Sequence, residues 1–141
     1  MNKPSIWFWV VAGLFLLWNV IGCYFYIVDV TMSDAQYAEQ FGAEMAAVRP
    51  LYPVWAIAAF AIAVWGGLVA AVLLLLRRAL SVPIFILSLI ASLICFIPNF
   101  TMAPLREAAG ATVWVMPLLI VVIGVVEIWF SRRERAKGTL R

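Results

Sequence analysis

The chain has 141 residues, of which 67% are hydrophobic, and its mean hydropathy is +1.07. Soluble domains are roughly 45–50% apolar, and a domain of this size cannot bury such an excess, so the composition excludes an ordinary water-soluble globule and predicts a protein embedded in lipid. The formal net charge is +3, and the chain contains no histidine, the most common metal ligand and neutral-pH base.

Long apolar runs, taken in chain order, predict four transmembrane helices. A bilayer core of about 30 Å requires about 20 apolar residues in helical form. Such runs occupy residues 6–28, 54–76, 79–97 and 112–130, and none shows the alternating pattern of a β-barrel strand. We therefore predict an all-α fold, in which one domain forms a four-helix antiparallel membrane bundle.

A short amphipathic helix is predicted over residues 34–48, in the loop between the first two spans. Ser33 and Gln36 have the spacing of a capping box, and Pro50 and Pro53 follow the helix. The apolar residues that recur at helical spacing are Ala38, Phe41, Met45 and Val48. We interpret this helix as a lid on the bundle or the lipid surface, and the alternative is a docking site for a partner.

Basic residues are concentrated on one side of the predicted membrane. Eight of the ten Lys and Arg residues flank the chain ends or join the second and third spans, whereas Arg49 and Arg106 lie on the opposite side. The positive-inside rule then predicts that both termini are cytoplasmic. The basic tail, residues 131–141, is expected to attract anionic lipid, and no folded nucleic-acid-binding module accompanies it.

Asn19 interrupts the first apolar run. An amide that faces hydrocarbon costs several kcal/mol, so Asn19 is expected to point into the bundle. The third span carries a matching polar seam at helical spacing: Ser81, Ser88, Ser92, Cys95 and Asn99. We interpret Asn19, Ser88, Ser92 and Asn99 as interhelical polar contacts, and the alternative is that they line the path of a small solute.

Small residues recur every four positions in the second span. They are Ala59, Ala63, Gly67 and Ala71. Small residues allow helix backbones to approach closely. This face is therefore predicted to pack against a helix, either within the bundle or from a neighbouring protein.

Glu127 is the only acidic residue inside any of the four apolar runs. Acidic residues inside a membrane are functional candidates. Glu127 lies three residues before the end of the fourth predicted span, so we place it at the cytoplasmic headgroup level. There it is expected to form an interfacial ion pair with Arg78 or Arg132, and the alternative is a role in proton relay.

The two cysteines, Cys23 and Cys95, fall near the outer ends of the first and third spans. A disulfide and a pair of buried free thiols are both compatible with this placement. Their separation does not match a CxxC redox motif or a zinc site. We therefore predict neither a metal nor a cofactor.

Three short segments resemble a group of small bacterial four-helix inner-membrane proteins, some of which carry the loose label "sugar transporter". The segments are LLWN at 16–19, DVTMS at 29–33 and AIAVWGG at 61–67. The resemblance implies a multi-pass protein of the bacterial inner membrane. The chain is also similar to small multidrug-resistance transporters in size and helix number, but its first span lacks the membrane-embedded glutamate on which that family depends.

No arrangement of residues in the sequence indicates catalysis. We expect a non-enzymatic integral membrane protein that acts through helix–helix or lipid contacts, either by self-association or as an accessory subunit of a larger membrane complex. The alternative is a small dimeric carrier for a neutral small solute, which would move along the seam that contains Asn19 and Ser92.

Overall fold

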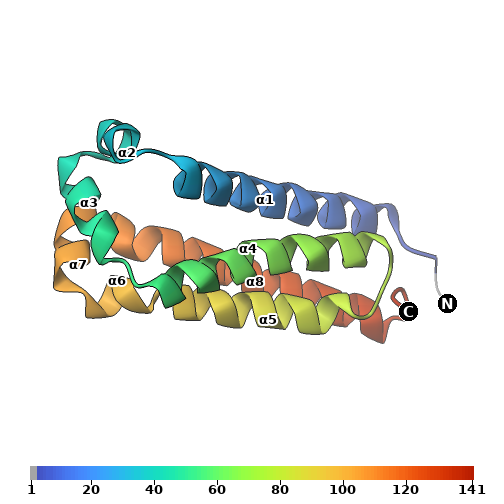
Figure 1. The fold of residues 1–141 in the computed structure, drawn as a ribbon. Coiled ribbons are helices and arrows are strands. Elements are labelled where there is room, and N and C mark those ends of the chain that lie inside the picture. The colour runs from blue at the N-terminus through green and yellow to red at the C-terminus, as the bar shows by residue number, and fades with distance from the viewer. Residues whose placement is uncertain (1–2) are drawn as a thin grey trace.

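A computed structural model describes residues 3–141 and shows a helical chain without strands in that range. The four long helices are α1 (Ile6–Thr31), α4 (Val54–Leu75), α5 (Ser81–Cys95) and α8 (Thr112–Ala136). The short elements are α2 (Asp34–Phe41), α3 (Ala43–Val48), the 3₁₀ helix η1 (Arg49–Leu51), α6 (Ile97–Thr101) and α7 (Ala103–Ala109). The start of α1 and the C-terminus lie at one end of the bundle, here named the terminal end, and the short helices form the opposite loop end (Figure 1).

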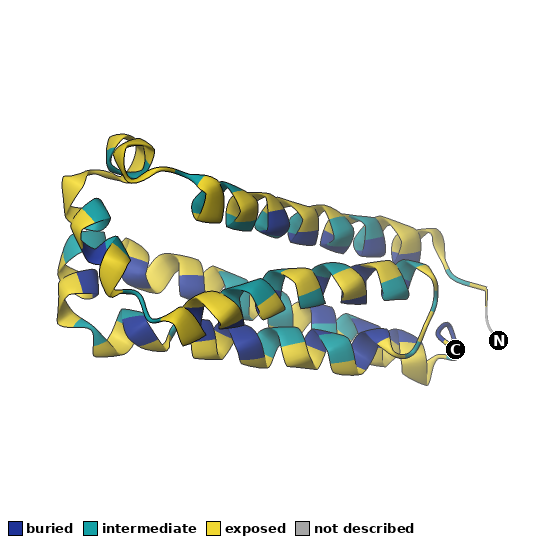
Figure 2. Ribbon diagram, in the orientation of Figure 1, coloured by how far each residue is buried: buried dark blue, intermediate teal, exposed yellow. Residues whose placement is uncertain are grey.

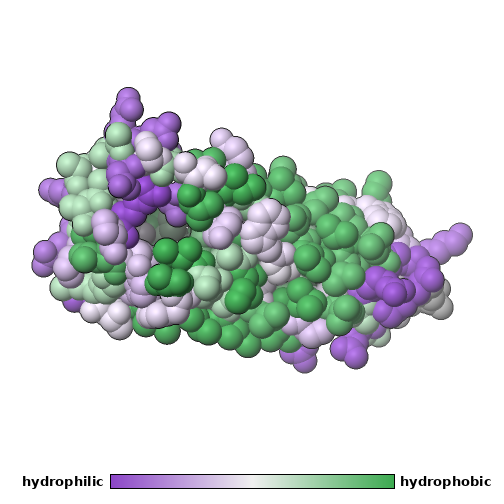
Figure 3. Space-filling model, viewed as in Figure 1, coloured by the Kyte–Doolittle hydropathy of each residue, from purple (hydrophilic) through white to green (hydrophobic). Residues whose placement is uncertain are grey.

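Four helical segments are long and apolar enough to cross a membrane, which confirms the predicted all-α, four-span architecture. The third of these segments runs from Ser81 to Thr101 and so includes α6. A broad hydrophobic surface separates hydrophilic residues at the two ends of the molecule (Figure 3). By length and composition, the chain is a multi-pass membrane protein.

The long helices pack in the order α1, α4, α5, α8. Buried residues lie on the side of α1 that faces the other helices, whereas its opposite side is exposed (Figure 2). The small-residue face of α4 is buried inside the bundle, where Ala59, Ala63, Gly67 and Ala71 lie. The absence of bulky side chains on this face allows α1 and α5 to pack closely on either side of α4.

A compact apolar core fills the terminal half of the bundle. Phe8 and Phe15 of α1 contact Phe130 of α8, with ring centroids 6.1 and 5.6 Å apart respectively. Leu74 of α4 is fully buried in the same cluster, and Phe85 lies at its inner edge. Aromatic pairs of this kind add about 0.5–1.5 kcal/mol beyond the burial of their area. Because the cluster residues are buried, side chains fill this half of the bundle.

The loop helix predicted over residues 34–48 is divided into α2 and α3. The capping box of Ser33 and Gln36 is present at the start of α2. Gly42 has a φ of 92°, which an α-helix cannot accommodate, and therefore separates the two helices. The prediction of one continuous helix was wrong for this reason.

The basic tail is partly folded against the bundle. Residues 131–136 continue α8, and the chain then folds back so that the Arg141 amide donates to the Arg77 carbonyl at 2.8 Å. Leu140 is buried in the core cluster of the terminal half. Part of the predicted lipid-binding tail is therefore packed against the α4–α5 turn.

Candidate functional site

Asn19 and Glu127 form a hydrogen-bonded pair in the interior of the bundle. The Asn19 amide nitrogen donates to Glu127 Oε2 at 2.8 Å and to the Phe15 carbonyl at 2.8 Å. Both side chains are buried, with 7% of Asn19 and 5% of Glu127 exposed. The pair joins α1 to α8, two helices that otherwise make few contacts along their backbones.

The pairing brings Glu127 beside the middle of α1. Asn19 lies 13 residues after the first and 12 before the last residue of α1. Glu127 of α8 is therefore level with the middle of α1. Ion pairs join Arg49 to Asp34 and Lys137 to Glu134. The predicted ion pair with Arg78 or Arg132 is not formed, because both arginines are exposed and the Glu127 carboxylate faces inward.

Gly67 provides the space that Asn19 occupies. A Cβ atom at Gly67 would overlap Asn19 Oδ1 and lie only 3.2 Å from both Asn19 Cγ and Ser88 Oγ. Ser88 in turn donates to the Ala63 carbonyl at 2.6 Å and so links α5 to α4. The glycine in the small-residue face therefore admits a polar side chain as well as a neighbouring helix.

A chamber of about 230 Å³ lies beside the pair and is lined by residues of all four long helices. It is open on one side, where the lining residues Ile21 and Phe25 are 41% and 58% exposed. It occupies the loop-end half of the bundle, next to the closed apolar core. Its polar lining includes Asn19, Ser88, Ser92 and Glu127. Its aromatic lining is formed by Trp18, Phe25, Phe60, Phe85 and Phe96. The chamber is thus mainly apolar, with polar groups concentrated where Asn19 meets Glu127.

The predicted polar seam is only partly continuous in the structure. Ser88 and Ser92 line the chamber with Asn19, but Asn99 does not. Asn99 lies on α6, where its Oδ1 accepts a hydrogen bond from the Tyr52 hydroxyl at 2.9 Å. Asn99 therefore ties the α6 segment to the chain that precedes α4. Burial raises the pKa of Tyr52 to about 12.

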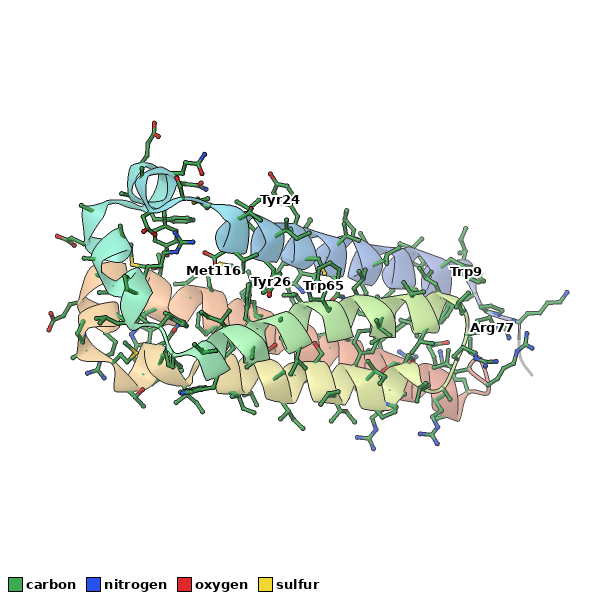
Figure 4. The ribbon with its side chains drawn as sticks, viewed as in Figure 1. Trp9, Tyr24, Tyr26, Trp65, Arg77 and Met116 are labelled. Carbon is green, nitrogen blue, oxygen red and sulfur yellow. The ribbon has the colours of Figure 1, made fainter. Side chains whose placement is uncertain are left out.

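Aromatic side chains occupy the space between α1 and α4 towards the loop end. Tyr26 of α1 lies 5.4 Å from Phe60 and 6.4 Å from Trp65, measured between ring centroids. Tyr26, Trp65 and the chamber residue Met116 lie in the same part of the molecule, whereas Tyr24 points away from it (Figure 4). Of these rings, Phe60 lines the chamber, and Tyr26 packs against it.

Arg49 holds the short helices of the loop end together. Its guanidinium donates to the carbonyls of Asp29 and Met32, at 2.7 and 3.1 Å, and to the Asp34 carboxylate at 3.2 Å. It also lies 4.5 Å from the centre of the Tyr37 ring. One side chain therefore joins the end of α1, the start of α2 and the segment that precedes α4.

The two cysteines are buried free thiols. Cys23 donates to the Val64 carbonyl at 3.3 Å, while Cys95 lines the chamber. In the described range, residues 3–141, no group of three or more potential ligands is arranged to hold a metal ion.

Sequence reasoning missed the contact between Asn19 and Glu127, although spacing in α8 contained a signal. Met116, Ile120, Gly124 and Glu127 follow one another at intervals of four, four and three residues, which places them on one helical face. All four line the chamber. This shared face predicts that the Glu127 side chain points into the bundle.

No protein-family model matches the chain, and neither a curated protein nor a solved structure is significantly similar to it. The resemblance to small bacterial four-helix proteins therefore stays a prediction. The site itself offers an apolar volume, one carboxylate and several hydrogen-bonding groups, a combination suited to reversible binding of a small molecule.

Proposed function

We propose that this chain is a non-catalytic membrane carrier that binds a small, largely apolar solute in the chamber between its four helices. The observation that carries the proposal is the position of the chamber, which is closed at the terminal end by the aromatic core and bounded by the Asn19–Glu127 pair. A volume of about 230 Å³ exceeds the roughly 150 Å³ cavity that admits benzene in an engineered protein.

The proposal prefers a carrier to a self-associating or accessory protein for a structural reason. The small-residue face of α4 was the feature of the sequence that suited a partner helix. In the structure α1 and α5 cover this face. A second protein could use it only if the bundle opened, so the face does not support self-association.

Equilibrium binding to the purified full chain in mild detergent tests the proposal. Isothermal titration with 2-phenylethanol should give saturable heat, which distinguishes binding in the chamber from partition into micelles. Ile120→Trp fills the chamber and should abolish the saturable heat. Val122→Trp is the matched control, because Val122 lies on the same helix and is 51% exposed. If the two variants bind the probe equally, the chamber is not the binding site.

We further propose that the terminal end faces the cytoplasm of the cell. The support is the positive-inside rule, since Arg77, Arg78 and the basic residues at the end of α8 all lie at the terminal end. Glu39→Cys and Arg132→Cys place an exposed thiol at opposite ends, while Cys23 and Cys95 are buried. In intact cells a membrane-impermeant maleimide should label the first variant and not the second. The reverse pattern would refute this orientation.

A further inference from the structure

The chamber contains an acidic group without a basic partner. Among the described residues, Glu127 Oε2 accepts a hydrogen bond from Asn19, but Oε1 has no recorded hydrogen-bond partner. No lysine or arginine is among the residues that line the chamber. A carboxylate in such surroundings is costly to ionise unless an opposite charge accompanies it.

The remaining walls favour a cation as well. Trp18 and Phe25 of α1, Phe60 of α4, and Phe96 at the junction of α5 and α6 line the same volume, with Phe25 at its open side. Aromatic faces attract cations, and tryptophan does so most strongly. A ligand that carried a negative charge would meet neither a basic side chain nor a favourable ring face in this chamber.

We propose that the chamber selects small apolar amines, with the ammonium group bound to Glu127 and the apolar body packed against the aromatic walls. This inference rests on the proposed function and narrows its solute from any small, largely apolar molecule to one that carries an ammonium group. An ammonium group has three donors, of which one reaches the Oε1 atom that the protein leaves without a partner. The chamber volume of about 230 Å³ accommodates one ring with a short side chain.

Three probes with one carbon skeleton test the inference in the unmodified full chain. They are 2-phenylethylammonium, 2-phenylethanol and phenylacetate, each titrated at neutral pH into the protein in mild detergent. The ammonium probe should bind about tenfold more tightly than the alcohol, as expected for a hydrogen bond to a charged group. Phenylacetate should give no saturable binding.

Two variants assign the preference to one residue. Glu127→Gln keeps the shape of the side chain but removes the opposite charge, so this variant should bind the ammonium no more tightly than the alcohol. Glu134→Gln is the matched control, because Glu134 is also a buried acid of α8 but pairs with Lys137 outside the chamber. This control should retain the preference for the ammonium probe.

The outcomes separate this inference from the proposed function. Equal affinity for the ammonium and the alcohol in the unmodified chain would overturn the inference and leave the proposed function intact. Absence of saturable binding for all three probes would overturn both. Retention of the ammonium preference in Glu127→Gln would overturn the assignment to Glu127. Circular dichroism of each variant confirms that it is folded, and the comparison of probes in the unmodified chain requires no variant.

Discussion

Replacing Gly67 with alanine tests the packing that holds the Asn19–Glu127 pair in place. The added Cβ would overlap Asn19 Oδ1, so the asparagine side chain has to move and its 2.8 Å hydrogen bond to Glu127 has to lengthen or break. Overpacking of a well-packed interior costs about 1–3 kcal/mol. Leaving a buried donor or acceptor without its partner adds about 1–3 kcal/mol. Since the two effects overlap, we expect Gly67→Ala to lower the free energy of unfolding by about 2–4 kcal/mol.

The neighbouring glycine supplies the control for this measurement. A Cβ at Gly66 would meet only Ser88 Cβ, at the ordinary contact distance of 3.8 Å. Alanine is favoured over glycine in a helix by about 1 kcal/mol, and this effect is common to both positions. Unfolding by titration of sodium dodecyl sulfate into mild detergent, followed by far-UV circular dichroism, should therefore separate Gly67→Ala from Gly66→Ala. Equal stabilities would refute the reasoning.

A double-mutant cycle identifies the side chain responsible. In an Asn19→Ala background the obstacle is absent, and the remaining close contact of a Cβ at Gly67 is with Ser88 Oγ at 3.2 Å. The penalty for Gly67→Ala should therefore become much smaller in that background. An unchanged penalty would show that Gly67 does not serve to accommodate Asn19.

Three further predictions follow from other contacts. Asn19→Leu should lower the free energy of unfolding by about 1–3 kcal/mol, because Glu127 loses its hydrogen-bond partner; unchanged stability in the detergent titration would contradict this. Arg49→Ala should accelerate amide hydrogen exchange across residues 29–41, because Arg49 holds this segment by three hydrogen bonds. Arg106→Ala is the control and should not accelerate it, because Arg106 bonds to a single carbonyl in α6. Tyr52 should ionise near pH 12 in a spectrophotometric titration. Since an exposed tyrosine ionises near pH 10, the contribution of Tyr52 to stability should be complete below pH 10 and be lost between about pH 10 and 12; Tyr52→Phe should remove this loss.

Helix number and approximate span positions were accessible from residue order because hydropathy is a local property. Each apolar run is long enough to cross a bilayer without reference to any other part of the chain. The predicted structure was wrong where one residue interrupts a helix or where a contact between distant segments changes the path of the chain. Gly42 divides the loop helix through its positive φ, and Leu140 folds back into the core because an apolar surface was available at the terminal end.

Polar residues inside the spans were also recognisable, and hydrogen-bonding requirements correctly directed Asn19 into the bundle. Their partners were not recognisable. Ser88 bonds to the Ala63 carbonyl, and Asn99 bonds to Tyr52, a residue outside the spans. One side chain can satisfy its hydrogen bonds in several ways, and helical spacing specifies its face but not the group opposite it.

Residue order establishes that this chain places about 20 apolar residues across lipid at each of four places, because transfer of a helix into hydrocarbon depends on its own side chains. Only the folded bundle brings Asn19 within 2.8 Å of Glu127, 108 residues further along the chain. It also leaves a chamber between aromatic residues of different helices. These features depend on how four helices rotate and tilt against one another, and that arrangement is set by contacts between residues far apart in sequence.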